Sequence, residues 1–185
     1  CLNYDALNKL SNQIGNFLLD IGLVKGDVVA IFNEKSPIAY SLMLACLKTG
    51  IIYANLDVSS PWVRIEKIVN NCQPRVIFFD QEENSVQQEF KLGFPKVLLF
   101  SLTERNIQER IYSLNSDNLR ITQQVHGGDA AYIMYTSGST GFPKGAVMSH
   151  NNILNFIQWG KYTFDVTPDD IFTNANPIYF DNSAF

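Results

Sequence analysis

Residues 27–54 have the sequence DVVAIFNEKSPIAYSLMLACLKTGIIYA, which contains the clearest pattern of strands and helices in the chain. Residues 27–32 are apolar after the first position, as in a strand that is buried on both faces. A Ser-Pro pair then supplies an N-cap and a proline at the first helical position. Residues 38–48 are apolar almost all round, which predicts a buried helix. Gly50 fits the end of that helix, and residues 51–54 predict a second buried strand.

The same alternation of strands and helices continues on both sides of this stretch. Upstream, apolar residues recur at steps of three and four, which predicts a helix that ends at Gly22. These residues are Leu7, Leu10, Ile14, Phe17 and Ile21. Downstream, a second Ser-Pro pair at 60–61 opens a helical pattern at 62–69, and apolar strands are expected at 76–79 and 97–100. The order predicts an α/β fold of layered, mostly parallel sheets with helices on both faces.

The pattern is lost from Thr103 to Gly128, where the chain is polar and rich in Asn, Gln and Ser. We expect this stretch, at about 103–128, to be a polar surface connection between two parts of the fold. Order returns at Ala130–Tyr135, an apolar strand that leads directly into TSGSTGFPKG at residues 136–145. A loop that follows a strand in this way lies where open α/β sheets bind their ligands.

The loop at 136–145 combines residue types that suit a phosphate group. Its glycines let the backbone come close to a ligand, and its hydroxyl and backbone N–H groups donate hydrogen bonds to phosphate oxygens. Lys144 adds a mobile positive charge. This is not a Walker A loop, because Lys144 stands between Pro143 and Gly145. A flexible Ser/Gly linker is the alternative interpretation, but linkers seldom lie tightly between two apolar strands.

The segment Ala131–Gly145 resembles the signature loop of the adenylate-forming superfamily. This superfamily includes acyl-CoA synthetases, beetle luciferases and the adenylation domains of nonribosomal peptide synthetases. The match covers Thr136–Gly141 and Pro143–Gly145. Three weaker resemblances follow in the family order at Leu2–Leu7, Leu47–Asp57 and Phe180–Ser183. In the second of them, Asn55 stands where a proline is usual. The resemblance implies that residues 1–185 are the N-terminal portion of the acyl-adenylate-forming fold.

The resemblance implies that the protein uses ATP and Mg²⁺, with the loop folded around the β- and γ-phosphates. The residues with this implied role are Thr136, Ser137, Gly138, Ser139, Thr140, Gly141 and Lys144. Preorganised donors and Mg²⁺ would relieve charge on the pyrophosphate as a substrate carboxylate attacks the α-phosphate. No residue of this chain is assigned as catalytic, because the catalytic lysine of the family lies outside it, and no metal ligand is assigned.

Asp181 resembles the aspartate with which the amino-acid-activating branch pairs the α-amino group of its substrate. The alternative is a helix-capping aspartate in an Asp-Asn-Ser cluster. With the amine role, the implied function is activation of an amino acid as acyl-AMP with release of pyrophosphate. Transfer to the phosphopantetheine thiol of a carrier protein would follow, within a larger multidomain synthetase.

Two other functions stay open, namely an acyl-CoA synthetase and a non-catalytic nucleotide-binding domain descended from such enzymes. An acyl-CoA synthetase of fatty acids has no ammonium to pair with Asp181. The sequence has no downstream Tyr-Gly-Pro-Thr-Glu-like motif, no ribose-binding aspartate and no small C-terminal domain. It also begins at Cys1 and stops at Phe185, straight after an apolar-polar run. We therefore expect a piece of a longer domain that is inactive by itself.

The net charge, the length of the apolar stretches and the cysteines indicate which partners and which cellular location to expect. The formal net charge of −4 at pH 7 gives no basic field that would attract nucleic acid or a membrane surface. The longest apolar stretch, Tyr40–Leu47, is far shorter than the ~20 residues of a membrane span. The three cysteines lack C-x-x-C spacing, which favours buried thiols in a reducing compartment. We therefore expect a cytoplasmic protein without nucleic-acid or membrane partners.

Overall fold

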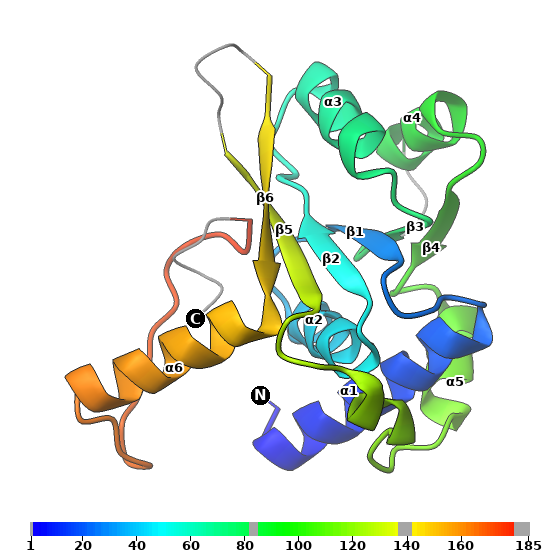
Figure 1. Cartoon of the computed structure of the whole chain (residues 1–185). Helices are drawn as coiled ribbons and strands as arrows, with labels where there is room; N and C mark the ends of the chain where they lie inside the picture. The colour runs from blue at the N-terminus through cyan, green and yellow to red at the C-terminus, as the bar shows by residue number, and fades with distance from the viewer. Residues whose placement is uncertain (1, 82–84, 137–141, 180–185) are drawn as a thin grey trace.

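The computed structural model describes residues 2–81, 85–136 and 142–179 (Figure 1). The helices and strands follow one another as α1 (Tyr4–Asp20), β1 (Val28–Phe32), α2 (Pro37–Thr49), β2 (Ile52–Asn55), α3 (Trp62–Cys72), β3 (Val76–Phe79), α4 (Ser85–Gly93), β4 (Leu98–Ser101), α5 (Arg105–Ser113), the 3₁₀ turn η1 (Arg120–Gln124), β5 (Ala130–Thr136), β6 (Lys144–Ser149) and α6 (His150–Thr163).

The strands form one six-stranded sheet in the order β4-β3-β1-β2-β5-β6. The pairs β4–β3, β3–β1, β1–β2 and β2–β5 are parallel, and β6 joins the edge in antiparallel orientation to β5. The prediction of a mostly parallel α/β sheet is therefore confirmed. The described residues form a single sheet, whose C-terminal edge carries the connections that follow β1, β2, β3 and β5.

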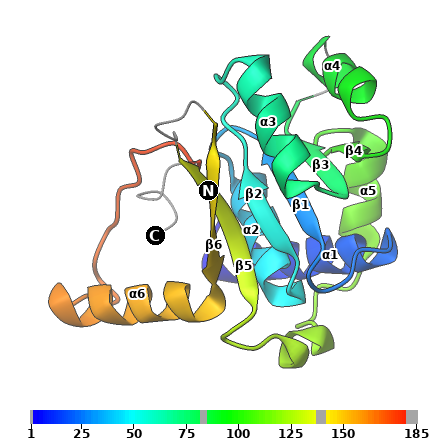
Figure 2. The same ribbon diagram turned by 45° about the horizontal axis from the view of Figure 1, so that its top comes forward.

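Helices cover both faces of this sheet, as the continuous apolar strands predicted (Figures 1 and 2). Alternate residues of β1 show the division, because Val29 and Ile31 join one core cluster while Ala30 joins the other. The first cluster contains residues of α1, α2 and α5, and the second contains residues of α3 and α4. Two of the large side chains, Phe17 and Phe78, are fully buried in the first cluster. Full burial of such a side chain stabilises a fold by ~1.5–3 kcal/mol.

The serine cap that the sequence predicts is present at the start of α2 but not at the start of α3. At α2, Ser36 accepts a hydrogen bond from the Ala39 N–H at 3.2 Å, and Gly50 ends the helix with a φ of 72°. At α3, the N-cap position is Pro61, which has no side-chain acceptor. The hydroxyl of Ser60 instead donates to Asp57 at 2.8 Å. The prediction of a serine cap was therefore wrong at α3, because the helix begins one residue later than a Ser60 cap requires and Pro61 occupies the N-cap position.

The polar stretch between β4 and β5 contains two elements that the sequence did not predict, namely α5 and η1. Helix α5 has a narrow apolar face, with Ile107 and Ile111 buried against the first core cluster. Arg110 adds an ion pair with Asp20 of α1 at 2.5 Å. A helix of nine residues with two apolar anchors gives only a weak periodic signal, so the surrounding polar residues concealed it.

Helix α6 follows β6 without a break and extends away from the sheet (Figure 1). A capping box of Ser149 and Asn152 fixes its start. No residue of α6 is buried against the part of the chain that the structure describes, and Leu154, Ile157 and Trp159 are each more than half exposed. None of the helices in the described ranges is both long and apolar enough to cross a membrane.

Candidate functional site

The candidate phosphate loop joins the two strands of the β5–β6 hairpin. Strand β5 runs parallel to β2, so its last residue, Thr136, lies at the C-terminal edge of the sheet. The antiparallel register places Thr136 directly opposite Lys144, the first residue of β6. Ser137–Gly141, which carry five of the predicted phosphate-binding positions, lie outside the described residues. The structure thus brings together the two predicted residues that flank them.

Lys144 is exposed at the tip of this hairpin. In the described ranges, no carboxylate lies within ion-pair distance of its amine. Directly opposed residues of an antiparallel pair have their Cβ atoms about 4.5–5.5 Å apart. The ammonium of Lys144 and the hydroxyl of Thr136 can therefore reach the same anionic group.

Tyr135 braces the hairpin one position below the loop. Its hydroxyl donates a hydrogen bond of 2.6 Å to the Asn71 side-chain oxygen, at the C-terminal end of α3. Burial, the neighbouring Cys72 and a hydrogen bond with it all raise the pKa of the Tyr135 hydroxyl, which is therefore a neutral donor at pH 7. The ring faces Gly145, its partner in the register of the hairpin. The brace thus links both strands of the hairpin to the second layer of helices.

Gly145→Ala is expected to strain this brace and to destabilise the protein by about 1 kcal/mol, at the low end of the cost of overpacking. A Cβ atom at position 145 would lie 3.0 Å from Ile133 Cγ2 and 3.1 Å from two ring atoms of Tyr135. The ring cannot retreat easily while its hydroxyl is held by Asn71. Urea denaturation of wild type, Gly145→Ala, Tyr135→Phe and the double variant would measure the coupling.

If the brace holds the ring, Gly145→Ala should cost less in the Tyr135→Phe background, where the ring is free to shift. Strictly additive effects of the two substitutions would show that the tyrosine hydroxyl does not restrain the ring. A stabilising effect of alanine in the wild-type background would contradict the steric argument altogether.

The C-terminal side of the loop rests on α3. Pro143 is buried, and it lines a pocket of about 290 Å³ together with Pro61, Val63, Arg64 and Lys67. The Lys67 amine lies 5.3 Å from the centre of the Phe142 ring, within the range of a cation–π contact. Phe142 and Pro143, the two residues before Lys144, therefore lie against α3, and this contact limits the positions that Lys144 can take.

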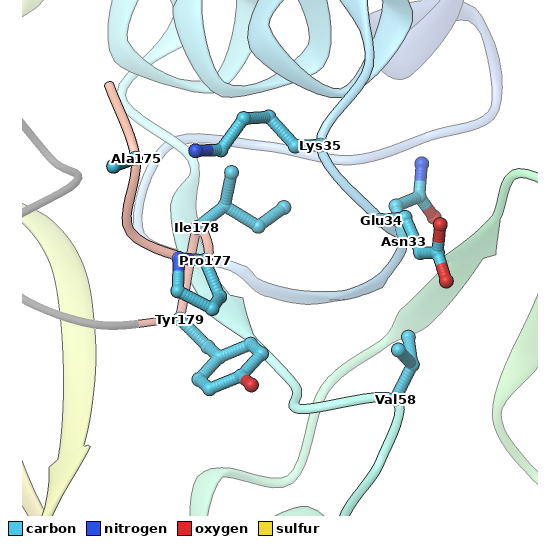
Figure 3. Close-up of a pocket in the computed structure, with 8 residues that line it drawn as sticks. All are labelled: Asn33, Glu34, Lys35, Val58, Ala175, Pro177, Ile178 and Tyr179. Atoms are coloured by element: carbon cyan, nitrogen blue, oxygen red, sulfur yellow. The ribbon is translucent and has the colours of Figure 1, made fainter. Parts of the chain in front are cut away.

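A second pocket lies at the C-terminal ends of β1 and β2, on the same edge of the sheet as the loop. It has a volume of about 310 Å³ (Figure 3). Its lining residues are Asn33, Glu34, Lys35, Val58, Ala175, Pro177, Ile178 and Tyr179. The first four follow β1 and β2, and the last four belong to the segment after α6, so the pocket joins parts of the chain that are far apart in sequence.

Hydrogen bonds hold this later segment against the sheet edge. Lys35 donates to the carbonyl and side-chain oxygens of Asn174, at 2.6 and 3.0 Å. Asn55, at the end of β2, donates to the carbonyl oxygen of Ile178 at 2.8 Å. The chain that leads to Asp181 is therefore attached to β1 and β2, whereas Asp181 itself lies outside the described residues.

The carboxylate of Asp57 also helps to attach the segment after α6 to the sheet edge, because it accepts a hydrogen bond from Tyr179. Burial alone would raise the pKa of its carboxyl group. Hydrogen bonds from the Ser59 and Ser60 hydroxyls, the Ser59 N–H and the Tyr179 side chain outweigh burial and hold this pKa below its ordinary value. The carboxylate therefore remains ionised at neutral pH and available to Tyr179.

The roles of Lys35 and Asn55 were not predicted from the sequence. Their partners lie 139 and 123 positions further along the chain, and a periodic pattern carries no information about such pairs. The sequence did contain one indication of a role for Asn55, because this residue stands where the similar family motif usually has a proline. A polar side chain at the end of a buried strand calls for a hydrogen-bond partner, and that partner is Ile178.

Known proteins resemble this chain over nearly all of its length. A family model described as AMP-binding enzyme matches residues 1–185. The chain is 30% identical over 186 residues to the L-proline--[L-prolyl-carrier protein] ligase of Pseudomonas fluorescens, covering 99% of the chain and 36% of the ligase. It is 32% identical over 184 residues to gramicidin S synthase 2 of Brevibacillus brevis, covering 100% of the chain and 4% of the synthase.

A solved structure with the same fold carries a nucleotide. The ATP-bound form of MatB from Rhodopseudomonas palustris matches with a TM-score of 0.87 and 27% identity, over 98% of the chain and 36% of MatB. The chain thus spans little more than a third of either the proline ligase or MatB. Since the family model matches the whole chain, including the hairpin and its loop, the chain belongs to the AMP-binding enzyme family.

Proposed function

We propose that residues 1–185 form the N-terminal part of an adenylation domain that uses ATP to activate the carboxylate of an amino acid. The product would be an aminoacyl-AMP, formed with release of pyrophosphate. Membership of the AMP-binding family supports the adenylation chemistry. The similarity to a proline–carrier protein ligase and to gramicidin S synthase 2 supports an amino acid as the acid.

The observation that carries the proposal is the hairpin register that sets Lys144 opposite Thr136 at the C-terminal edge of the sheet. The segment between them holds the five remaining candidates for phosphate binding, Ser137, Gly138, Ser139, Thr140 and Gly141. A loop closed in this way can surround a phosphate chain with hydroxyl and N–H donors. The ATP-bound structure of MatB supports a nucleotide as the ligand of this fold.

In the proposed reaction a carboxylate oxygen attacks the α-phosphorus of ATP. The new O–P bond forms as the bond between the α-phosphorus and the oxygen that bridges to the β-phosphorus breaks, and pyrophosphate carries away the electron pair. Lys144 and the hydroxyls of the loop would hold the β- and γ-phosphates and balance the charge on the leaving group. Fixing both reactants in line removes an entropic barrier of up to ~7–11 kcal/mol.

We assign the substrate ammonium to Asp181, because a carboxylate pairs with an ammonium through a charge-assisted hydrogen bond. The aminoacyl group would then pass to the phosphopantetheine thiol of a carrier protein in a larger synthetase. The named function of the proline ligase supports a carrier protein as acceptor. We propose a cytoplasmic location, which is supported by the free thiols of Cys46 and Cys72.

We propose that Mg²⁺ binds together with ATP, because this ion is usually held by substrate phosphates and one or two carboxylates. Within the described ranges, no three His, Cys, Asp or Glu side chains gather as a metal site. We therefore assign none of these described side chains as a metal ligand, and we assign the balancing of charge on the leaving group to Lys144 and the loop donors.

The test is to identify the product made by the complete protein that contains this sequence. With ATP, Mg²⁺ and a panel of amino acids, we expect mass spectrometry to detect an aminoacyl-AMP, followed by loading of a phosphopantetheinylated carrier protein in preference to free CoA. Preferential formation of acyl-CoA from acids without an amino group would assign the protein to the acyl-CoA synthetases. Binding of ATP without any adenylate would support the non-catalytic alternative.

A further inference from the structure

Helix α3 is fixed on the sheet by its apolar face. Ile65, Ile68 and Val69 of this helix are each at most 4% exposed, and they belong to the second core cluster. The helix ends at Cys72, and the N–H of Gln73 closes its last turn by donating to the Val69 carbonyl oxygen at 2.9 Å. The backbone at this end of the helix is therefore held in place relative to the sheet.

Asn71 lies in this last turn, and its side chain reaches strand β5. Its oxygen accepts the hydroxyl hydrogen of Tyr135 at 2.6 Å, across 64 positions of sequence. Tyr135 also makes a hydrogen bond with Cys72 and packs against the second core cluster. Because sulfur is a weak acceptor, the asparagine oxygen is the stronger partner of this hydroxyl. Asn71 is exposed, so a substitution there leaves the core of the protein unchanged.

The register of the hairpin connects this contact to the mouth of the loop. Tyr135 pairs with Gly145, and the next pair is Thr136 with Lys144. The ring of Tyr135 lies so close to Gly145 that a Cβ atom on this glycine would be 3.1 Å from two ring atoms. Lys144 is thus the immediate neighbour of a residue whose position the ring limits. A shift of the ring would therefore allow the start of β6 to shift as well.

A second contact with α3 holds the chain on the other side of Lys144. The amine of Lys67 lies 5.3 Å from the centre of the Phe142 ring, and the buried Pro143 lines a pocket with Lys67. Figures 1 and 2 show α3 beside the loop end of the hairpin. Lys144 therefore lies between two residues, Pro143 and Gly145, whose positions both depend on this helix.

The position of the Lys144 backbone matters because its ammonium stands on a flexible four-carbon side chain. The protein can direct such a charge only by fixing the chain from which it projects. Stabilisation of a leaving group depends on charges that are in place before the reaction begins. A misplacement of about 1 Å can lower a reaction rate about 100-fold.

We propose that Asn71 is a positioning residue for Lys144 and that it acts through the hydroxyl and the ring of Tyr135. This inference rests on the proposed function, in which Lys144 balances the charge on the leaving pyrophosphate. Asn71 itself contacts neither ATP nor the acid. Its contribution is therefore expected in the rate of adenylation and not in the affinity for the carboxylate substrate.

The test measures ATP–pyrophosphate exchange by the complete protein with its preferred acid, in wild type, Asn71→Leu and Tyr135→Phe. Leucine matches the size of asparagine and removes the acceptor, whereas phenylalanine keeps the ring and removes the hydroxyl. We expect each substitution to lower kcat about 10-fold, less than a full misplacement of the charge would, while the KM for the acid stays near its wild-type value. Asn71→Asp keeps the shape and the acceptor, so it should retain most of the wild-type rate.

A double-mutant cycle with Lys144→Ala separates positioning from a general loss of structure. If Asn71 acts by placing the Lys144 charge, Asn71→Leu should have little further effect on kcat once that charge is gone. A smaller folded fraction would instead lower the rate by the same factor in both backgrounds. Asn16→Leu is a matched control, because the Asn16 side chain donates to the Asn115 carbonyl oxygen from α1, at 2.8 Å. This control should keep the wild-type rate.

Equal factors in the two backgrounds would overturn the inference and leave Asn71 as a structural residue. A wild-type kcat in both Asn71→Leu and Tyr135→Phe would overturn it as well. Tyr135→Phe provides the readout if Asn71→Leu fails to fold, which a thermal melt of each variant would reveal. Failure of the proposed function would look different, because the wild-type protein would show no exchange that depends on an acid, and the basis of the inference would be lost with it.

Discussion

Lys144→Ala is expected to lower the rate of ATP–pyrophosphate exchange by the complete protein about 10²–10³-fold, the usual loss for one preorganised electrostatic group. Lys144 stands opposite Thr136 at the mouth of the loop, exposed and without an ion pair to the described residues. Its charge would be used most when pyrophosphate leaves. The rate of adenylation should therefore fall more than the affinity for the carboxylate substrate does.

Lys9→Ala is the control for a general effect of lost charge. Lys9 lies on the surface of α1, where it pairs with Asp5 at 2.8 Å. Surface pairs of this kind contribute little, so exchange should stay at the wild-type rate. Lys144→Arg should retain part of the activity because it keeps the charge, but with a different shape. An unchanged exchange rate in Lys144→Ala would refute the role of Lys144 in phosphate binding.

Asp181→Ala is expected to lower kcat/KM for the amino acid substrate about 10²–10³-fold or more. Under the proposed pairing, the substitution leaves the substrate ammonium without its carboxylate partner. Breaking a buried charge pair typically costs ~3–5 kcal/mol, and each 1.36 kcal/mol corresponds to a factor of ten in rate. Steady-state exchange kinetics with the amino acid and with its amine-free analogue would measure the effect.

The amine-free analogue should lose little activity in Asp181→Ala, because it has no charge to leave unpaired. Asp117→Ala, at an exposed position in the connection before β5, should change neither substrate. Equal losses for the two substrates in Asp181→Ala would show that Asp181 is structural, as in the helix-capping alternative. A wild-type protein that prefers the amine-free acid would fit an acyl-CoA synthetase instead.

Strands β1, β2 and β3 could be predicted from the sequence because they are short, apolar and separated by helices with recognisable ends. Ser36 and Gly50 mark the limits of α2 with side-chain and backbone chemistry that is local. Helices α4 and α5 could not be predicted in the same way. Each buries only two side chains, such as Ile107 and Ile111 of α5, and most of their remaining residues are polar.

The candidate site was predictable only in part. The loop sequence suggested phosphate binding, and the hairpin register then brought Thr136 and Lys144 together, which the spacing of residues along the chain does not reveal. The roles of Ser137–Gly141 and Asp181 stay predictions from the resemblance. The attachment of Ile178 to Asn55 depends on how the segment after α6 returns to the sheet, which local sequence preferences do not determine.

We propose above all that the chain belongs to an enzyme that adenylates amino acids. The most direct measurement is exchange of labelled pyrophosphate into ATP by the complete wild-type protein, with each amino acid compared with the same acid lacking its amino group. We expect exchange that depends on one amino acid or a few related ones and that is much weaker with the amine-free acid. Exchange that is as fast with the amine-free acid, or absent with every amino acid, would contradict it.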